Sequence, residues 1–88
     1  MKASILHILE RATNEQGNYS GSQKSQMQRI ESWQTTVLND LRRALGQQEI
    51  RGRARSDSPV RRQAITALTN DIKRICGASV SLPKFMDK

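Results

Sequence analysis

Arginine is concentrated in one stretch of this 88-residue chain, and it is the side chain best suited to bind phosphate. Residues 47–62 contain five arginines and only two acidic residues, which makes this segment the most positive part of the sequence. Each planar guanidinium group can donate two hydrogen bonds to one phosphate or to one base edge. The five are Arg51, Arg53, Arg55, Arg61 and Arg62. This stretch therefore predicts contact with a polyanion.

Three of these arginines alternate with other residues between Arg51 and Arg55. Alternate side chains of an extended chain point to the same side. An extended arm of this kind would follow a groove of duplex DNA, and insertion into the minor groove is one such arrangement. A flexible cationic linker without a bound partner would have the same sequence, so both interpretations stay open.

A helix is expected directly after the arm, from about residue 59 to residue 76. Ser58 is a suitable N-cap, and Pro59 suits the first helical position, where a missing N–H costs no hydrogen bond. Apolar residues then recur at steps of three and four, which is the helical period. Gly77 suits the left-handed conformation that commonly follows the last helical residue.

One edge of this expected helix combines cations with hydroxyl groups. Helical spacing places Arg62, Thr66, Thr69 and Lys73 in a polar stripe beside the apolar face, with Asn70 further round. Such side chains suit phosphate oxygens, and an asparagine can reach the edge of a base. A solvated face with basic residues near the C-terminal turn is the alternative. The neighbouring arm favours binding, so these residues and the five arginines form the predicted nucleic-acid-binding site.

The composition limits the class of partner. A formal net charge of +7 attracts nucleic acid, anionic membranes and acidic proteins alike. Aromatic residues make up 3% of the chain, too few for the stacking platforms that bind single strands, so duplex DNA is favoured over RNA. No apolar run approaches the roughly 20 residues that span a membrane, and the apolar faces lack the flanking residues of membrane-surface helices. We expect no membrane partner.

The elements that must position these side chains predict an all-α fold. We expect a single small three-helix domain covering residues 1–88, with helices at about 3–16, 23–45 and 59–76. Trp33 is expected at the centre of an otherwise aliphatic core. Because so thin a core leaves little stability, we also expect a homodimer.

Two segments outside the helices carry further expectations. The Arg-rich connection of residues 47–58 is too long for a standard helix-turn-helix, so it is expected to be either mobile or functional. The tail of residues 77–88 is expected to be extended, with Val80, Leu82 and Phe85 lying across the bundle or against a partner.

The sequence offers little for catalysis. Cys76 is the only cysteine and His7 the only histidine, so an internal disulfide and a Cys/His metal cluster are both excluded. No Gly-rich phosphate loop and no nucleophile elbow occurs. We therefore expect a non-enzyme without catalytic residues, metal or cofactor. Cys76 falls on an apolar face, which favours a buried structural thiol, and a lone thiol is typical of the reducing cytoplasm.

Two hypotheses about function follow. The first is a DNA-binding accessory protein or transcriptional regulator that contacts the phosphate backbone through the arm and the third helix. The second is a protein-binding module (an inhibitor, adaptor or assembly subunit) that docks on an acidic partner, with the apolar tail as an anchor. The first requires the arginines to be open to solvent, since guanidinium groups held by the chain's own carboxylates would favour the second. No motif is specific enough to identify a family.

Overall fold

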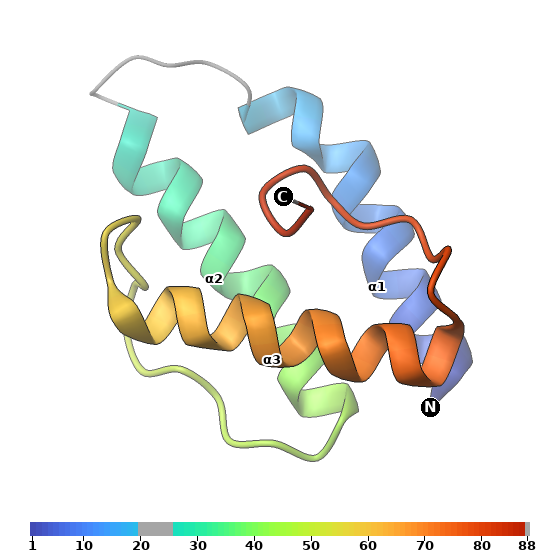
Figure 1. The fold of residues 1–88 in the computed structure, drawn as a ribbon. Helices are drawn as coiled ribbons and strands as arrows, with labels where there is room; N and C mark the ends of the chain where they lie inside the picture. The colour runs from blue at the N-terminus through green and yellow to red at the C-terminus, as the bar shows by residue number, and fades with distance from the viewer. Residues whose placement is uncertain (20–25, 88) are drawn as a thin grey trace.

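The computed structural model describes residues 1–19 and 26–87, and it is built from helices joined by loops (Figure 1). The three α-helices are α1 (Lys2–Glu15), α2 (Met27–Ala44) and α3 (Pro59–Cys76), and a short 3₁₀ helix, η1 (Gln16–Tyr19), follows α1 directly. No residue of the described ranges lies in a strand. The predicted all-α, three-helix fold is confirmed.

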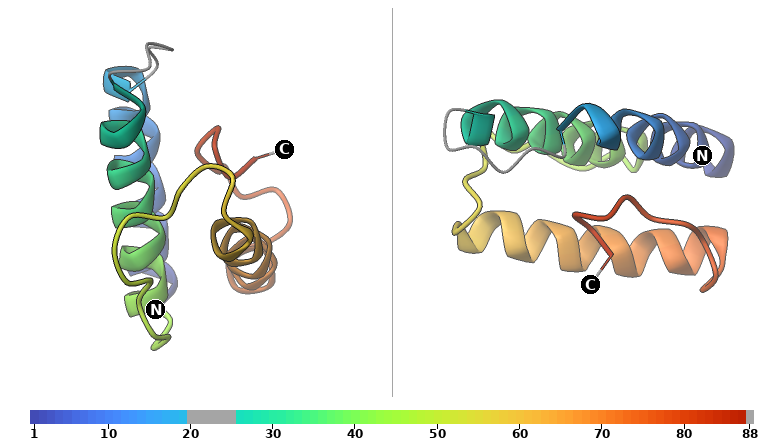
Figure 2. Two further views of the ribbon diagram at one scale, coloured as in Figure 1. Left: turned by 90° about the vertical axis from the view of Figure 1, so that its left-hand side faces the viewer. Right: turned by 90° about the horizontal axis from the view of Figure 1, so that it is seen from above.

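The helices form two layers. Figure 2 shows α1 and α2 side by side in one layer and α3 crossing them in a second. The chain beyond α3 turns back over α1, so the C-terminal segment lies on the same side of the first layer as α3 (Figure 1). The outward side of α3 therefore faces away from the other two helices.

The predicted helix boundaries agree with the structure to within a few residues. The third helix has the expected bounds, and the first begins and ends one residue earlier than expected. The second ends at Ala44, and the start predicted for it falls outside the described residues. Gly77 has a φ of +102° and donates its N–H to Lys73 O at 2.9 Å. Ser58 is the N-cap residue of α3, as expected, although its side chain makes no cap hydrogen bond.

The core lies between the two layers. Trp33 is 7% exposed, its ring stacks on Tyr19 at a centroid distance of 4.7 Å, and Phe85 meets it edge-on at 5.4 Å. The predicted central position of Trp33 is thus confirmed. Around it, all three helices contribute aliphatic side chains, namely Ile5, Leu9, Ala12, Val37, Leu38, Leu41, Ile65, Leu68 and Ile72. Burial of these side chains is the main favourable term in folding.

The tail completes this core. Met86 is 3% exposed and Pro83 is fully buried, while Val80, Leu82 and Phe85 pack against the core cluster. A turn at residues 83–86 is closed by a hydrogen bond from the Met86 N–H to Pro83 O at 2.9 Å. The tail therefore lies across the bundle, one of its two expected positions, and its last residues form a turn. Its apolar side chains are used within the chain, which removes the predicted anchor for a partner's groove.

Candidate nucleic-acid interface

The linker between α2 and α3, residues 45–58, is fastened to one face of α2. The Asn39 amide makes two hydrogen bonds to the backbone of Ile50, donating to its O at 3.1 Å and accepting from its N–H at 2.7 Å. One turn earlier on the helix, Thr35 Oγ1 accepts a hydrogen bond from the Ala54 N–H at 2.9 Å, and Ala54 is 5% exposed. The linker thus runs back along α2 as an ordered segment and does not project as a mobile arm.

Glu31, which is also buried, is the third of these anchors. Its Oε2 accepts a hydrogen bond from the Ser56 N–H at 2.6 Å, and its Oε1 lies 3.2 Å from Arg53 Nε. The hydrogen bond from Ser56 lowers the pKa of Glu31, against the opposing effect of burial, and the positive charges of Arg53 and Arg55 lower it further. The carboxylate is therefore held ionised under the linker.

These three anchors were not predicted from the sequence. Glu31, Thr35 and Asn39 follow one another at four-residue steps, which places them on one helical face. A polar stripe of this kind looks like a solvated surface unless the segment that covers it is known. The four-residue spacing of three hydrogen-bonding side chains was the only signal in the sequence.

The three arginines of the arm do not share a direction. Gly52 has a φ of +71°, in the left-handed region, so the backbone is not extended between Arg51 and Arg53. Arg51 is exposed and its side chain contacts no described acidic group. Arg53 pairs with Glu31, and Arg55 Nε lies 3.8 Å from Asp57 Oδ1, with both of these side chains largely exposed. The prediction of an extended arm with all three arginines on the same side is therefore wrong.

Arg61, also a predicted contact residue, is turned inward. Its Nη2 donates a hydrogen bond to Gln34 Oε1 on α2 at 2.7 Å, and its Nε is buried without a partner among the described residues. Burial lowers the pKa of Arg61, although the nearby charge of Glu31 opposes that effect. Arg61 therefore joins α3 to α2 and lies apart from the exposed side of the helix.

The exposed side of α3 retains the predicted stripe. Arg62, Thr66, Asn70 and Lys73 are all exposed, and we call these four residues the outer stripe. Thr66 Oγ1 donates to Arg62 O at 3.1 Å, which leaves the Thr66 hydroxyl oxygen able to accept. Eleven residues at a rise of 1.5 Å separate the two cations by about 16 Å along the axis. Thr69, at the edge of the stripe, is half-buried, and its Oγ1 has no partner among the described residues.

No described carboxylate neutralises the outer stripe. The only acidic residue of α3 is Asp71, which accepts hydrogen bonds from Gln47 and Arg74, each at 3.0 Å. Elsewhere, acidic groups also pair locally, as in the contacts of Arg11 with Asp40 and of Arg43 with Glu49, both at 2.8 Å. Because its carboxylates are so largely occupied, the net positive charge of the chain resides on the cations that lack an acidic partner.

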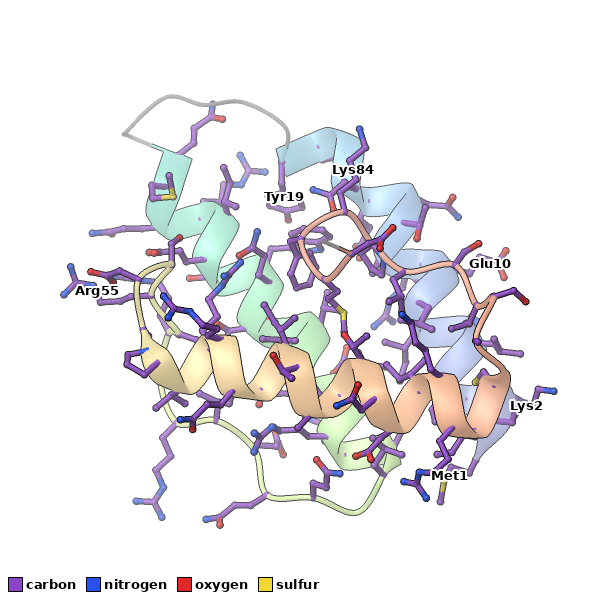
Figure 3. The ribbon with its side chains drawn as sticks, viewed as in Figure 1. Met1, Lys2, Glu10, Tyr19, Arg55 and Lys84 are labelled. Carbon is purple, nitrogen blue, oxygen red and sulfur yellow. The ribbon has the colours of Figure 1, made fainter. Side chains whose placement is uncertain are left out.

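Exposed cations lie at several places on the surface. Figure 3 shows Arg55 at the left edge of the molecule beside the start of α3, whereas Lys2 and Lys84 lie at the lower right and at the top. Neither lysine has an ion pair among the described residues. Lys2 and Lys84 therefore carry charge comparable to that of the outer stripe, but they are scattered rather than aligned on one helix.

Two shallow hollows follow α3 alongside the outer stripe. The first has a volume of about 100 Å³ and is lined by Ser56, Arg61, Arg62, Ile65 and Thr66. The second has a volume of about 190 Å³ and is lined by Ile65, Thr66, Thr69, Asn70 and Met86. Since Ile65 and Thr66 line both, the two hollows adjoin. Most of the predicted site residues thus come together here, whereas Arg51, Arg53 and Arg55 lie apart along the linker.

Residues 1–19 and 26–87 contain no group of three or more His, Cys, Asp or Glu side chains placed to hold a metal ion. Within the same ranges, no helix combines the length and the apolar character needed to cross a membrane. Comparison of the chain with protein-family models, with curated proteins and with solved structures gives no match.

Proposed function

We propose that this chain is a DNA-binding protein that contacts duplex DNA through the outer stripe of α3. The observation that carries the proposal is the position of Arg62 and Lys73 at the two ends of one helical stripe, where both are exposed and neither has an acidic partner in residues 1–19 and 26–87. Thr66 and Asn70 lie between them and offer a hydroxyl and an amide. Cations at both ends with neutral hydrogen-bonding groups in the middle match the order of phosphates and base edges across a groove.

The dimensions of a DNA groove support this arrangement. The major groove is about 12 Å wide and admits an α-helix. The two cations are separated by about 16 Å along the helix, so they can reach phosphates at opposite rims while Thr66 and Asn70 face the base edges. Because α3 forms its own layer (Figure 2), its outer stripe can approach a duplex without the other helices intervening.

The arginines of the linker take different parts in this proposal. Arg51 and Arg55 are exposed and serve as additional contacts to the phosphate backbone. Arg53 and Arg61 are held by Glu31 and Gln34, so they position the linker and α3. The proposed interface is therefore smaller than the sequence predicted, and it is centred on α3.

We further propose that the protein acts as an accessory protein or transcriptional regulator in the cytoplasm, without enzymatic activity or a cofactor. A homodimer would present two copies of α3 to two half-sites, which is the usual arrangement for helix-based readers of duplex DNA. The exposure of Met1 at 68% and of Leu6 at 40% leaves apolar surface at the start of α1 for such a contact. Light scattering of the full chain measures this oligomeric state.

An acidic protein partner remains the alternative, because the same exposed cations would attract it. The contact of Arg53 with the chain's own carboxylate Glu31 favours this alternative at that residue. The salt dependence of binding distinguishes DNA from an acidic protein. Binding to DNA phosphates releases condensed counterions, so the logarithm of the affinity falls linearly with the logarithm of the salt concentration.

The test measures the affinity for duplex DNA, single strands and structured RNA as salt is raised. We expect the duplex to bind best. The variant Arg62→Ala/Lys73→Ala should weaken that binding and reduce the slope of log affinity against log salt by about 1.8, or about 0.9 for each lost phosphate contact.

The matched control is Lys2→Ala/Lys84→Ala, which removes the same charge from the scattered cations. It should change the slope much less than the variant of the outer stripe. Equal losses in the two variants would show general attraction to a basic surface, and the assignment to α3 would then be wrong.

A further inference from the structure

The smaller of the two hollows along α3 lies where the linker meets the helix. Its volume of about 100 Å³ is room for about three water molecules at roughly 30 Å³ each. A nucleoside is too large for this space, whereas a phosphate group fits it. The size of the hollow therefore limits its occupant to a small group.

Hydrogen-bond donors from two elements surround this hollow. Arg61 and Arg62 contribute guanidinium groups, and Ser56 and Thr66 contribute hydroxyls. The Ser56 hydroxyl lies 3.7 Å from Met27 Sδ, a weak acceptor that a phosphate oxygen would replace. Two guanidinium groups and the Ser56 hydroxyl make a donor set suited to an oxyanion, whereas the Thr66 hydroxyl already donates to Arg62 O.

Arg61 lacks a charged hydrogen-bond partner within the described residues. Its Nη2 bonds to the neutral amide of Gln34, and its Nε is buried and unpaired. Glu31 is the carboxylate whose charge acts on Arg61, but the two Glu31 oxygens already contact Arg53 and the Ser56 N–H. A half-buried cation without a matched anion is unfavourable, and a bound anion would relieve that penalty.

The surrounding charges also favour an anion. Four guanidinium groups, those of Arg53, Arg55, Arg61 and Arg62, gather near this junction, and they are accompanied by the carboxylates of Glu31 and Asp57. The junction therefore carries an excess of positive charge. The positive end of the dipole of the 18-residue helix α3 adds to it.

We propose that this hollow binds one phosphate group of a nucleic-acid strand, held by Arg61 and Arg62 together with the hydroxyl of Ser56. The inference rests on the proposed function and assigns one of its backbone contacts to a defined set of residues. Free phosphate would be held by the same groups. The experiment therefore measures free phosphate and duplex DNA in separate arms.

The first arm measures the melting temperature of the full chain in sodium phosphate and in sodium chloride at equal ionic strength and pH. A ligand that binds only the folded state stabilises it by mass action, so phosphate should raise the melting temperature by roughly 4 °C. Equal melting temperatures in the two salts would overturn the proposal.

Two variants of equal charge test the location. The Arg62 side chain makes no hydrogen bond or ion pair with the described residues, so Arg62→Met should fold normally and lose most of the rise caused by phosphate. Lys73→Met removes the same charge about three turns further along α3 and should keep the full rise. A full rise in Arg62→Met would place the phosphate elsewhere.

Arg61→Met addresses the buried cation directly. It should also lose the rise caused by phosphate, and its melting temperature in chloride should stay level or increase, because an apolar side chain replaces an incompletely paired charge. If this variant does not fold, Arg62→Met alone decides the question.

The second arm measures affinity for one duplex with 5′-hydroxyl ends and for the same duplex with 5′-phosphate ends. Equal affinity for the two, reduced in Arg62→Met, supports a phosphate within the strand, and preference for phosphorylated ends supports a terminal one. If the chain binds duplex DNA but phosphate does not raise its melting temperature, the proposed phosphate site in the hollow is wrong and the proposed function is unaffected. If phosphate raises the melting temperature but the chain binds no duplex DNA, the proposed function is wrong and the hollow is a site for free phosphate.

Discussion

Two neighbouring regions of this molecule use basic residues in different ways. Along the linker, Arg53 is held by the buried carboxylate of Glu31, and at the start of α3 Arg61 donates to Gln34. On the outward side of the same helix, Arg62 and Lys73 have no acidic partner among the described residues. The residue types are similar, so the direction of each side chain relative to α2 decides whether it supports the fold or stays available for a partner.

The comparison shows why a high density of arginine does not by itself define an interface. The linker needs its own hydrogen-bond partners because it runs over α2 without forming a helix or a strand. Asn39, Thr35 and Glu31 supply these partners to its backbone, and Glu31 then draws in Arg53. The charge of Arg53 is consequently paired with the Glu31 carboxylate, which holds the linker on α2.

The largest effect is expected when this carboxylate is removed. Glu31→Ala leaves the Ser56 N–H without its acceptor and Arg53 without its anion, in a place where Glu31 is 6% exposed. Arg53 is partly exposed, so the main loss is the buried acceptor of the Ser56 N–H, which costs about 1–3 kcal/mol. We therefore expect the free energy of unfolding, measured by urea denaturation, to fall by about that amount.

Glu49→Ala is the matched control for this prediction. Glu49 also pairs with an arginine, Arg43, but both side chains are largely exposed. An exposed pair contributes about 0–1 kcal/mol, so this variant should change the free energy of unfolding much less. Similar losses in the two variants would contradict the anchoring role of Glu31.

The dependence of stability on pH gives a second and smaller effect. Hydrogen bonding from Ser56 lowers the pKa of Glu31 from its ordinary value of 4.5. Glu31 therefore contributes stability that is fully present above its unfolded pKa and is lost as the pH falls through its lower folded pKa. The difference in free energy of unfolding between the wild type and Glu31→Gln should be constant at neutral pH and shrink below about pH 4.5.

Asp71 also has a lowered pKa, caused first by the Gln47 hydrogen bond and then by Arg74. Both proteins in the pH experiment retain Asp71, so its contribution cancels in their difference. A difference that stays constant down to acid denaturation would show that the ionised form of Glu31 does not stabilise the linker.

Much of the fold could be predicted from the sequence because it depends on local chemistry. The period of the apolar residues gave three helices, and Pro59 and Gly77 marked the ends of the third. Trp33 was expected in the core because it is the only tryptophan of an aromatic-poor chain, and it lies there.

The course of the linker and the tail could not be predicted in the same way. The linker depends on contacts such as the bond between Asn39 and Ile50, which lie eleven residues apart and show no periodic signal. The tail depends on space left between the layers for Met86 and Pro83. The inward direction of Arg61 likewise follows from Gln34 on another helix. Such contacts are set by tertiary packing, so only the outer stripe of the candidate site could be read from helical spacing.

The smallest expected effect compares two arginines of the linker that lie two residues apart. Arg51 is exposed without an acidic partner among the described residues, whereas Arg53 pairs with Glu31. Arg51→Ala should leave the free energy of unfolding unchanged and reduce the salt slope of duplex binding by about 0.9. Arg53→Ala should leave that slope unchanged and lower the free energy of unfolding by about 1 kcal/mol.

The two variants carry the same charge, so a difference between their slopes must come from the direction of the side chain. Equal slopes would mean that the linker binds DNA as a diffuse cationic segment, and the division between supporting and available arginines would not extend to it.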